Sequence, residues 1–303
     1  MAIVGTGSLA KALWPGVNAW VGADYDEGSQ EWKEIFQSFK SDKNYEQDIT
    51  LAQTGLLSVK PEGQNINYDD FKQGFVQNYT HLVYGSGFIL TREHIEDNQY
   101  MELARARASM LGKSARQTKE RVAANILDRA FNSNYTGADG LELCSTAHLL
   151  EKGGTYQNEL TTAADLSEAS LEQMSIDIMD LRDGANKLIS VQPRKLIIPR
   201  QLCFEAERIL KSSLQNDSAN NALNALKAKG ILPEGYAVNR YLTDVDAFFI
   251  LTDVSNGLKH FERRMLEVDN DTDFDSENMK FKVTERYSFG WTDPRGIYGS
   301  PGA

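Results

Sequence analysis

The residues best suited to binding a metal ion form an acidic run near the C-terminal end of the sequence. Asp269, Asp271 and Asp273 match the first three ligand positions of a calcium-binding loop. The sixth position of such a loop should be glycine and is Phe274, and the twelfth should be glutamate and is Lys280. We therefore predict a solvated acidic connection between two strands, and no metal site.

The histidines and cysteines do not form a zinc-binding or catalytic set. The sequence has 4 histidines and 2 cysteines, and their spacing matches no zinc motif. Cys144 and His148 are close in sequence, but a third and a fourth ligand are missing nearby. We expect Cys144 and Cys203 to be free thiols in a reducing compartment rather than a disulfide.

Motifs for nucleophilic or nucleotide chemistry are also missing from the sequence. Gly85-Ser86-Gly87 is too short for a nucleophile elbow and lies within an alternating strand pattern. Lys113-Ser114 lacks the glycines of a Walker loop. We predict no catalytic residue, no cofactor and no enzyme activity, and keep a soluble α/β enzyme with an unrecognised active site as the alternative.

Composition and charge narrow the class of protein further. The chain has 303 residues, 41% of them hydrophobic, and a net charge of -11 from 43 acidic and 32 basic residues. Tight, general binding to nucleic acid needs a basic surface, so it is disfavoured. No apolar run reaches the ~18 residues of a membrane span, and Met1 to Ala12 does not resemble a signal peptide.

The first fifty residues hold three of the four tryptophans. Trp14, Trp20 and Trp32 lie among several glycines, with no sustained helix or strand period before Ser29 to Phe39. Bulky aromatic side chains on a loosely structured segment need a surface to cover them. Either the segment packs on its own core, or it is an arm that lies across a neighbouring subunit through Trp14 or Trp20.

A long β-hairpin is predicted for residues 50–90. Alternation begins at Leu57 and Val59, Pro61-Glu62-Gly63 form a turn beside Lys60, and the return strand runs from Tyr79 to Leu90. Because an isolated two-stranded hairpin is marginally stable, it must pack on another surface.

The residues from Thr91 to Asn132 predict one long helix. Ala104, Ala108 and Leu111 begin an apolar stripe with three- and four-residue spacing. About forty helical residues would span ~60 Å, whereas a compact globule of this length is roughly 50 Å across. The helix would therefore be the backbone of an elongated molecule.

The remainder alternates between helical and strand patterns. Helices are predicted at 166–181 and 202–214, and strands at 196–198, 236–242 and 247–252, with further strand character from 257 to 290. A polar stretch, 216–224, is predicted to be an exposed loop.

The order of these elements, together with two C-terminal stretches, resembles a known family. The stretches are Tyr241 to Phe249 leading to Gly257 to Arg263, and Glu285-Arg286-Tyr287-Ser288-Phe289-Gly290-Trp291-Thr292-Asp293-Pro294-Arg295-Gly296. They resemble the major capsid proteins of tailed bacteriophages, which have the Hong Kong 97-type fold. A related nanocompartment shell protein is a further alternative.

The resemblance implies an α+β fold with defined parts. Residues 1–49 would be the N-terminal arm and 50–90 the extended loop. Residues 91–140 and 253–303 would form the peripheral domain with its spine helix, and 141–252 the axial domain, with 216–224 near the capsomer centre. The subunit contacts would involve Trp14, Trp20, Lys60, Pro61, Glu62 and Gly63.

The resemblance also implies partners and a location. The protein would assemble with itself into hexamers and pentamers of an icosahedral head around double-stranded DNA, which it would contact weakly. A portal protein and in some cases a decoration protein would join the shell, which would assemble in the bacterial host cytoplasm without a membrane. Since the chain starts at Met1, we expect no cleaved leader and therefore a separate scaffolding protein. Some relatives cross-link through a loop lysine, but no partner for Lys60 is identifiable, so we do not predict that bond.

Overall fold

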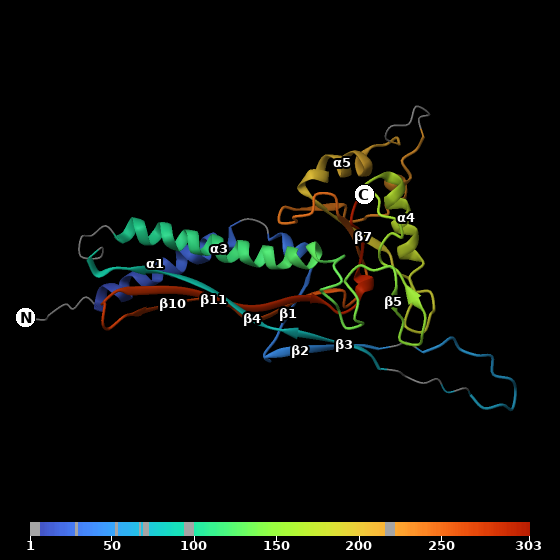
Figure 1. Ribbon diagram of the computed structural model, residues 1–303, viewed down its shortest axis with the longest axis horizontal. Coiled ribbons are helices and arrows are strands. Elements are labelled where there is room, and N and C mark those ends of the chain that lie inside the picture. The colour runs from blue at the N-terminus through green and yellow to red at the C-terminus, as the bar shows by residue number, and fades with distance from the viewer. Residues whose placement is uncertain are drawn as a thin grey trace, which may run out of the picture.

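The computed structural model describes residues 7–27, 30–51, 54–66, 68, 73–93, 100–215 and 222–303. Two long helices lie along one sheet, a second α/β unit stands at one end of it, and a loop projects beyond the body (Figure 1). The chain exposes 17102 Å², whereas a compact protein of this mass exposes ~12,800 Å². The elongated shape predicted from the sequence is thus confirmed.

The first sheet combines strands from both ends of the chain. Its order is β1 (Gln37–Lys40), β10 (Leu258–Thr272), β11 (Met279–Trp291) and β4 (Leu82–Leu90). β1 is parallel to β10, and the other pairs are antiparallel. Alternate residues of β11, from Met279 to Tyr287, are buried, so one face of the sheet is apolar and needs a cover.

The two helices α1 (Gly7–Asp26) and α3 (Tyr100–Asp128) supply that cover. The expectation of no helix before Ser29 is wrong. Val17 and Val21, one helical turn apart, are buried against α3, and a Cβ at Gly112 would lie 2.6 Å from the Val21 carbonyl oxygen. Close packing against α3 therefore stabilises α1 despite its poor local signal.

The stretch from Ser29 to Phe39, for which the sequence left helix and strand open, contains both kinds of element. The chain there forms a short 3-10 helix, η1 (Glu31–Glu34), and then enters β1. Trp32, Ile35 and Phe36 are buried in the central core, and pairing with β10 keeps the chain extended from Gln37 to Lys40.

The long helix is shorter than predicted. α3 has 29 residues, which corresponds to about 43 Å, and part of its predicted first turns, 94–99, lies outside the described residues. It ends at Asp128 because the chain turns there: the Ala130 carbonyl accepts from the Cys144 backbone N–H at 2.8 Å.

The second sheet lies in the unit formed mainly by the middle of the chain. Its order is β12 (Ile297–Ser300), β9 (Phe248–Thr252), β7 (Pro193–Pro199) and β8 (Tyr236–Asn239). Around it lie the helices α4 (Glu168–Met179), α5 (Cys203–Lys211) and α6 (Ala225–Lys229), the 3-10 turns η2 (Arg200–Leu202) and η3 (Pro294–Gly296), and the short pair β5 (His148–Leu149) and β6 (Thr155–Tyr156). The strands and helices predicted here are confirmed.

One assignment at the C-terminal end differs from the expectation. β10 and β11 lie in the first sheet, whereas β12 pairs with β9 in the second sheet. The turn η3 redirects the chain, and Tyr298 enters the second core with no exposed surface. The last strand therefore joins the two units.

The predicted hairpin is built differently from the expectation. β2 (Tyr45–Leu51) pairs with β3 (Gln73–Thr80) in a two-stranded ribbon, and the described residues 54–66 and 68 between them form no strand. The predicted return strand is divided at His81, after which β4 enters the first sheet. The buried His81 ring bonds Ser41 and Ser288, each at 3.0 Å, which holds the break in place.

Candidate assembly surfaces

The projecting loop exposes apolar side chains to solvent. Leu56, Leu57 and Val59 are 85%, 100% and 92% exposed. Isolated exposed hydrophobic side chains are normal, but a run of them on a projecting segment marks an interaction site. The loop thus presents a surface that its own chain does not cover.

The loop tip forms the predicted turn. The Gln64 N–H donates to the Pro61 carbonyl at 3.2 Å, and Gly63 has a φ of 77°, a conformation that favours glycine. Lys60, Pro61, Glu62 and Gly63 are all exposed. Their contact with another subunit remains a prediction.

A polar network fixes the base of the ribbon. Asp48 on β2 accepts from Lys259 Nζ at 2.5 Å and from Thr292 Oγ1 at 2.8 Å. The Tyr79 hydroxyl on β3 bonds Thr292 Oγ1 at 2.6 Å. Because Lys259 is buried, this charge pair is shielded from solvent. The ribbon is therefore held at its base while the loop beyond it projects.

The three N-terminal tryptophans have different environments. Trp32 is buried in its own core, with its ring 5.5 Å from that of Phe289. Trp20 is partly buried against the core between α1, α3 and the first sheet, and the side chain of Trp14 lies outside the described residues. The packing of the segment on its own core is confirmed for Trp32, and an intersubunit contact by Trp14 or Trp20 remains a prediction.

Charged groups are buried where α3 crosses the first sheet. Lys119 on α3 forms an ion pair with Glu285 on β11, and both side chains are 4% exposed. The Tyr25 hydroxyl on α1 donates to the same carboxylate at 3.0 Å. The ammonium lies 5.1 Å from the Trp32 ring centre and 5.0 Å from that of Tyr287, distances at which the aromatic faces stabilise it.

This cluster includes a histidine held in its neutral form. Burial and the nearby Lys119 charge lower the pKa of His260 to about 3. The ring has no exposed surface, and its Nδ1 bonds the Ser38 hydroxyl at 3.0 Å. A general base must reach its substrate. Because the His260 ring has no exposed surface, its role is structural.

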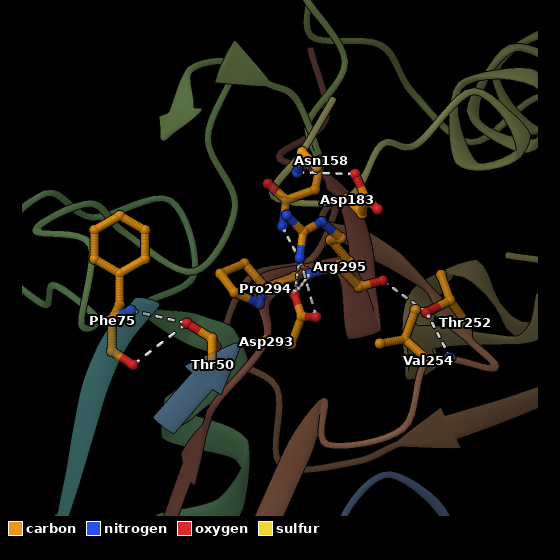
Figure 2. A network of polar contacts seen from close by, with 10 residues as sticks. Thr50, Phe75, Asn158, Asp183, Thr252, Val254, Asp293, Pro294 and Arg295 are labelled. Carbon is orange, nitrogen blue, oxygen red and sulfur yellow. Dashed lines mark hydrogen bonds and ion pairs between the residues drawn. The ribbon is translucent and has the colours of Figure 1, made fainter. Parts of the chain in front are cut away.

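A second polar network lies at the junction of the two units (Figure 2). The buried Asn158 amide donates to the carbonyls of Leu143, Pro294 and Ile297 at 2.8, 2.9 and 3.2 Å, and its oxygen accepts from the Ser145 N–H at 2.8 Å. No sequence signal singled out this residue, because its partners are backbone groups from distant segments.

Arg295 completes the junction. Its guanidinium pairs with Asp293 at 3.2 Å, and its carbonyl accepts from Thr252 Oγ1 at 2.7 Å. A cleft of about 450 Å³ beside it is lined by several carboxylates, including those of Asp183 and Asp253. Each of these two aspartates accepts a backbone N–H at 2.8 Å, from Lys187 and Gln192 respectively, so they serve local loop structure.

The acidic run lies along the hairpin of β10 and β11. Asp269 pairs with Lys282 at 3.1 Å, and Asp273 pairs with Lys280 at 3.2 Å. Within the described residues, no group of three histidine, cysteine or carboxylate side chains is placed to hold a metal ion. Both cysteines are free. In the described parts of the chain, no helix is long and apolar enough to cross a membrane.

The chain is thus an elongated α+β body with a fixed ribbon and an exposed apolar loop. The chain belongs to the phage capsid protein family, whose model matches residues 76–300. This family places the protein in the shell of a phage head, associated with copies of itself. No curated protein matches the sequence.

Solved capsid structures share the fold across nearly the whole chain. The capsid of cyanophage P-SCSP1u is 10% identical with a TM-score of 0.57, covering 91% of this chain and 88% of that one. The procapsid of bacteriophage JBD30 is 13% identical with a TM-score of 0.53, covering 97% of this chain and 75% of that one. The structure from Mycobacterium phage Che8 is 14% identical with a TM-score of 0.51, covering 91% of this chain and 93% of that one. The fold is thus of the Hong Kong 97 type.

Proposed function

We propose that the protein is the major capsid protein of a tailed phage and that it forms the hexamers and pentamers of an icosahedral head around double-stranded DNA. The observation that carries this proposal is the projecting loop, whose leucines are exposed in the single chain. Burying such side chains between subunits contributes ~25 cal/mol per Å² before association costs are subtracted. Many copies of one weak contact then stabilise a closed shell.

The domain roles follow the family resemblance. Residues 1–49 are the proposed arm, and within them α1 and β1 pack on this chain's own spine helix and first sheet, while β2 begins the ribbon. The ribbon and loop reach the neighbouring subunit, and the spine helix with the first sheet forms the peripheral domain. The second unit is the axial domain, and the stretch 216–224, of which 216–221 lie outside the described residues, remains the candidate for the capsomer centre. The role is structural, without catalysis.

The partners outside the shell are proposed on the same basis. A portal protein, a scaffolding protein and decoration proteins join copies that assemble in the host cytoplasm. The net charge of -11 supports weak, non-specific contact with the packaged DNA, because phosphate repels an acidic surface.

Electron microscopy of the purified protein tests the proposal. We expect closed shells or their capsomers, and a folded monomer that forms neither would contradict the proposal. Replacing Pro61-Glu62-Gly63 by three serines is expected to reduce particle yield while leaving the circular dichroism of the subunit unchanged. Loss of subunit folding would show instead that the tip belongs to the core.

A further inference from the structure

The strand β4 leaves one long edge of the first sheet unpaired. It lies at the end of the order β1-β10-β11-β4, and no described strand pairs with its other side. Its nine residues, LVYGSGFIL, contain no charge and no proline. Proteins usually protect a free edge with charges, proline, a bulge or a cover, so an uncharged edge of this length indicates an interaction site.

The outer side of β4 is accessible to a hydrogen-bond donor. Nη1 of Arg107 on α3 donates to the carbonyl oxygen of Ile89 at 2.8 Å. Val83 and Ile89 lie on the sheet face away from α3 and are 59% and 48% exposed. An incoming strand would find backbone groups at the edge and apolar side chains beside them.

The sequence of β4 reads almost the same in both directions. Outward from Ser86, the matched positions are Gly85 with Gly87, Tyr84 with Phe88, Val83 with Ile89, and Leu82 with Leu90. The glycines are required within the chain, because a Cβ at Gly87 would lie 2.4 Å from the Phe281 carbonyl oxygen. Tyr84 and Phe88 also have partners within the chain, because they stack on Tyr287 and Phe281 of β11. The match of Val83 with Ile89 joins two exposed side chains and has no such requirement from β11.

We propose that β4 pairs antiparallel with β4 of a second copy, about a twofold axis through Ser86. The proposal rests on the self-association in the proposed function and names the surface and the partner strand. In this register Val83 meets Ile89 of the second copy, and Tyr84 meets its Phe88. Each pair joins residues that lie on the same face of the sheet, as antiparallel pairing requires.

The pairing joins two four-stranded sheets into one. Aromatic and β-branched pairs across antiparallel strands are stabilising, and no charge is buried. A twofold contact uses the same surface on both subunits, which a nearly palindromic strand provides. Arg107 releases the Ile89 carbonyl when the second strand arrives.

Disulfide trapping tests the axis. Residues directly opposite in antiparallel strands have Cα atoms about 4.5–5.5 Å apart, within the ~4.4–6.8 Å range of a disulfide. In a Cys203→Ser background, we expect Ser86→Cys to form a covalent dimer in assembled particles under mild oxidation. Ser276→Cys, which replaces an exposed serine on the β10–β11 turn, is the matched control and is expected to remain monomeric.

A mixed assembly tests the register. Val83→Cys alone places the two thiols roughly 20 Å apart, and Ile89→Cys alone does the same. We therefore expect neither variant to cross-link by itself and an equimolar co-assembly of the two to give the dimer. Cross-linking by either variant alone would overturn the register.

The outcomes separate this proposal from the proposed function. Particles in which Ser86→Cys remains monomeric would overturn the β4 pairing and leave the capsid function standing. Covalent dimers that form without particles would support the pairing and contradict the shell. Val83→Lys with Ile89→Lys, judged folded by circular dichroism, is expected to raise the concentration needed for assembly roughly tenfold, and unchanged assembly would count against the pairing.

Discussion

The buried cluster around Lys119 and the loop 54–66 represent opposite extremes of this molecule. In the cluster, the Lys119 ammonium contacts a carboxylate, a tyrosine hydroxyl and two aromatic faces of the same chain. In the loop, Leu57 is fully exposed. The first region is completed by folding, whereas the second keeps apolar side chains that its own chain does not cover.

The difference shows how a shell subunit divides its sequence between two tasks. Residues that satisfy each other inside the chain determine whether the subunit folds. Under the proposed function, residues left exposed determine whether folded subunits assemble. Mutations in the two regions should therefore separate subunit stability from particle formation.

The largest effect is expected for Lys119→Ala. It leaves the Glu285 carboxylate, which is 4% exposed, without its cation, and such an uncompensated buried charge costs about 3–5 kcal/mol. The measurement is the free energy of unfolding of the unassembled subunit in urea. The double variant Lys119→Met with Glu285→Leu is expected to recover most of the loss, because it removes both charges. A single variant as stable as the wild type would show that the pair is not buried in solution.

A smaller effect is expected from the pH dependence of Glu120. Its carboxylate accepts from the Trp32 N–H at 3.1 Å, and burial raises its pKa to about 7. Between the unfolded pKa, near 4.5, and 7, the folded state binds more protons, so its stability falls as pH rises through this window.

The variant Glu120→Gln keeps an acceptor for Trp32 and cannot titrate. We expect it to melt a few degrees above the wild type at pH 8 and close to it at pH 5. His260, whose lowered pKa destabilises the fold as pH falls below about 6.5, is present in both proteins and cancels in the comparison. An equal difference at both pH values would refute the role of Glu120 ionisation.

The smallest effect on folding is expected for Leu57→Ser. Since Leu57 is fully exposed, the free energy of unfolding should change by less than about 0.5 kcal/mol, while particle yield falls. Leu171→Ser, at a position with no exposed surface, is the matched control and should unfold the subunit. If Leu57→Ser assembled normally, the loop would not carry the contact.

The sequence predicted the elements whose signals are local. Ser167 caps α4 with a side-chain bond to the Ser170 N–H at 3.1 Å, and the apolar run at Leu196 to Ile198 forms the centre of β7. The tip turn at Gly63 was also predictable, because turn residues act within a few positions. The resemblance of the C-terminal stretches then supplied the family.

The features that were not predicted depend on distant partners. α1 requires the close approach at Gly112, and the break at His81 requires the hydroxyls of Ser41 and Ser288. Asn158 bonds backbone groups up to 139 residues away. Local periodicity carries no information about such contacts.

The composition of the first sheet has a consequence for biosynthesis. Gln37 pairs with Lys259, and Leu82 pairs with Tyr287. β1 and β4 are therefore synthesised before the strands with which they pair. Such non-local pairing forms slowly, and until then the uncharged β4 is exposed to aggregation in the nascent polypeptide. To obtain this subunit in soluble form, β10 and β11 must therefore pair with β1 and β4 before β4 contacts another copy of the chain.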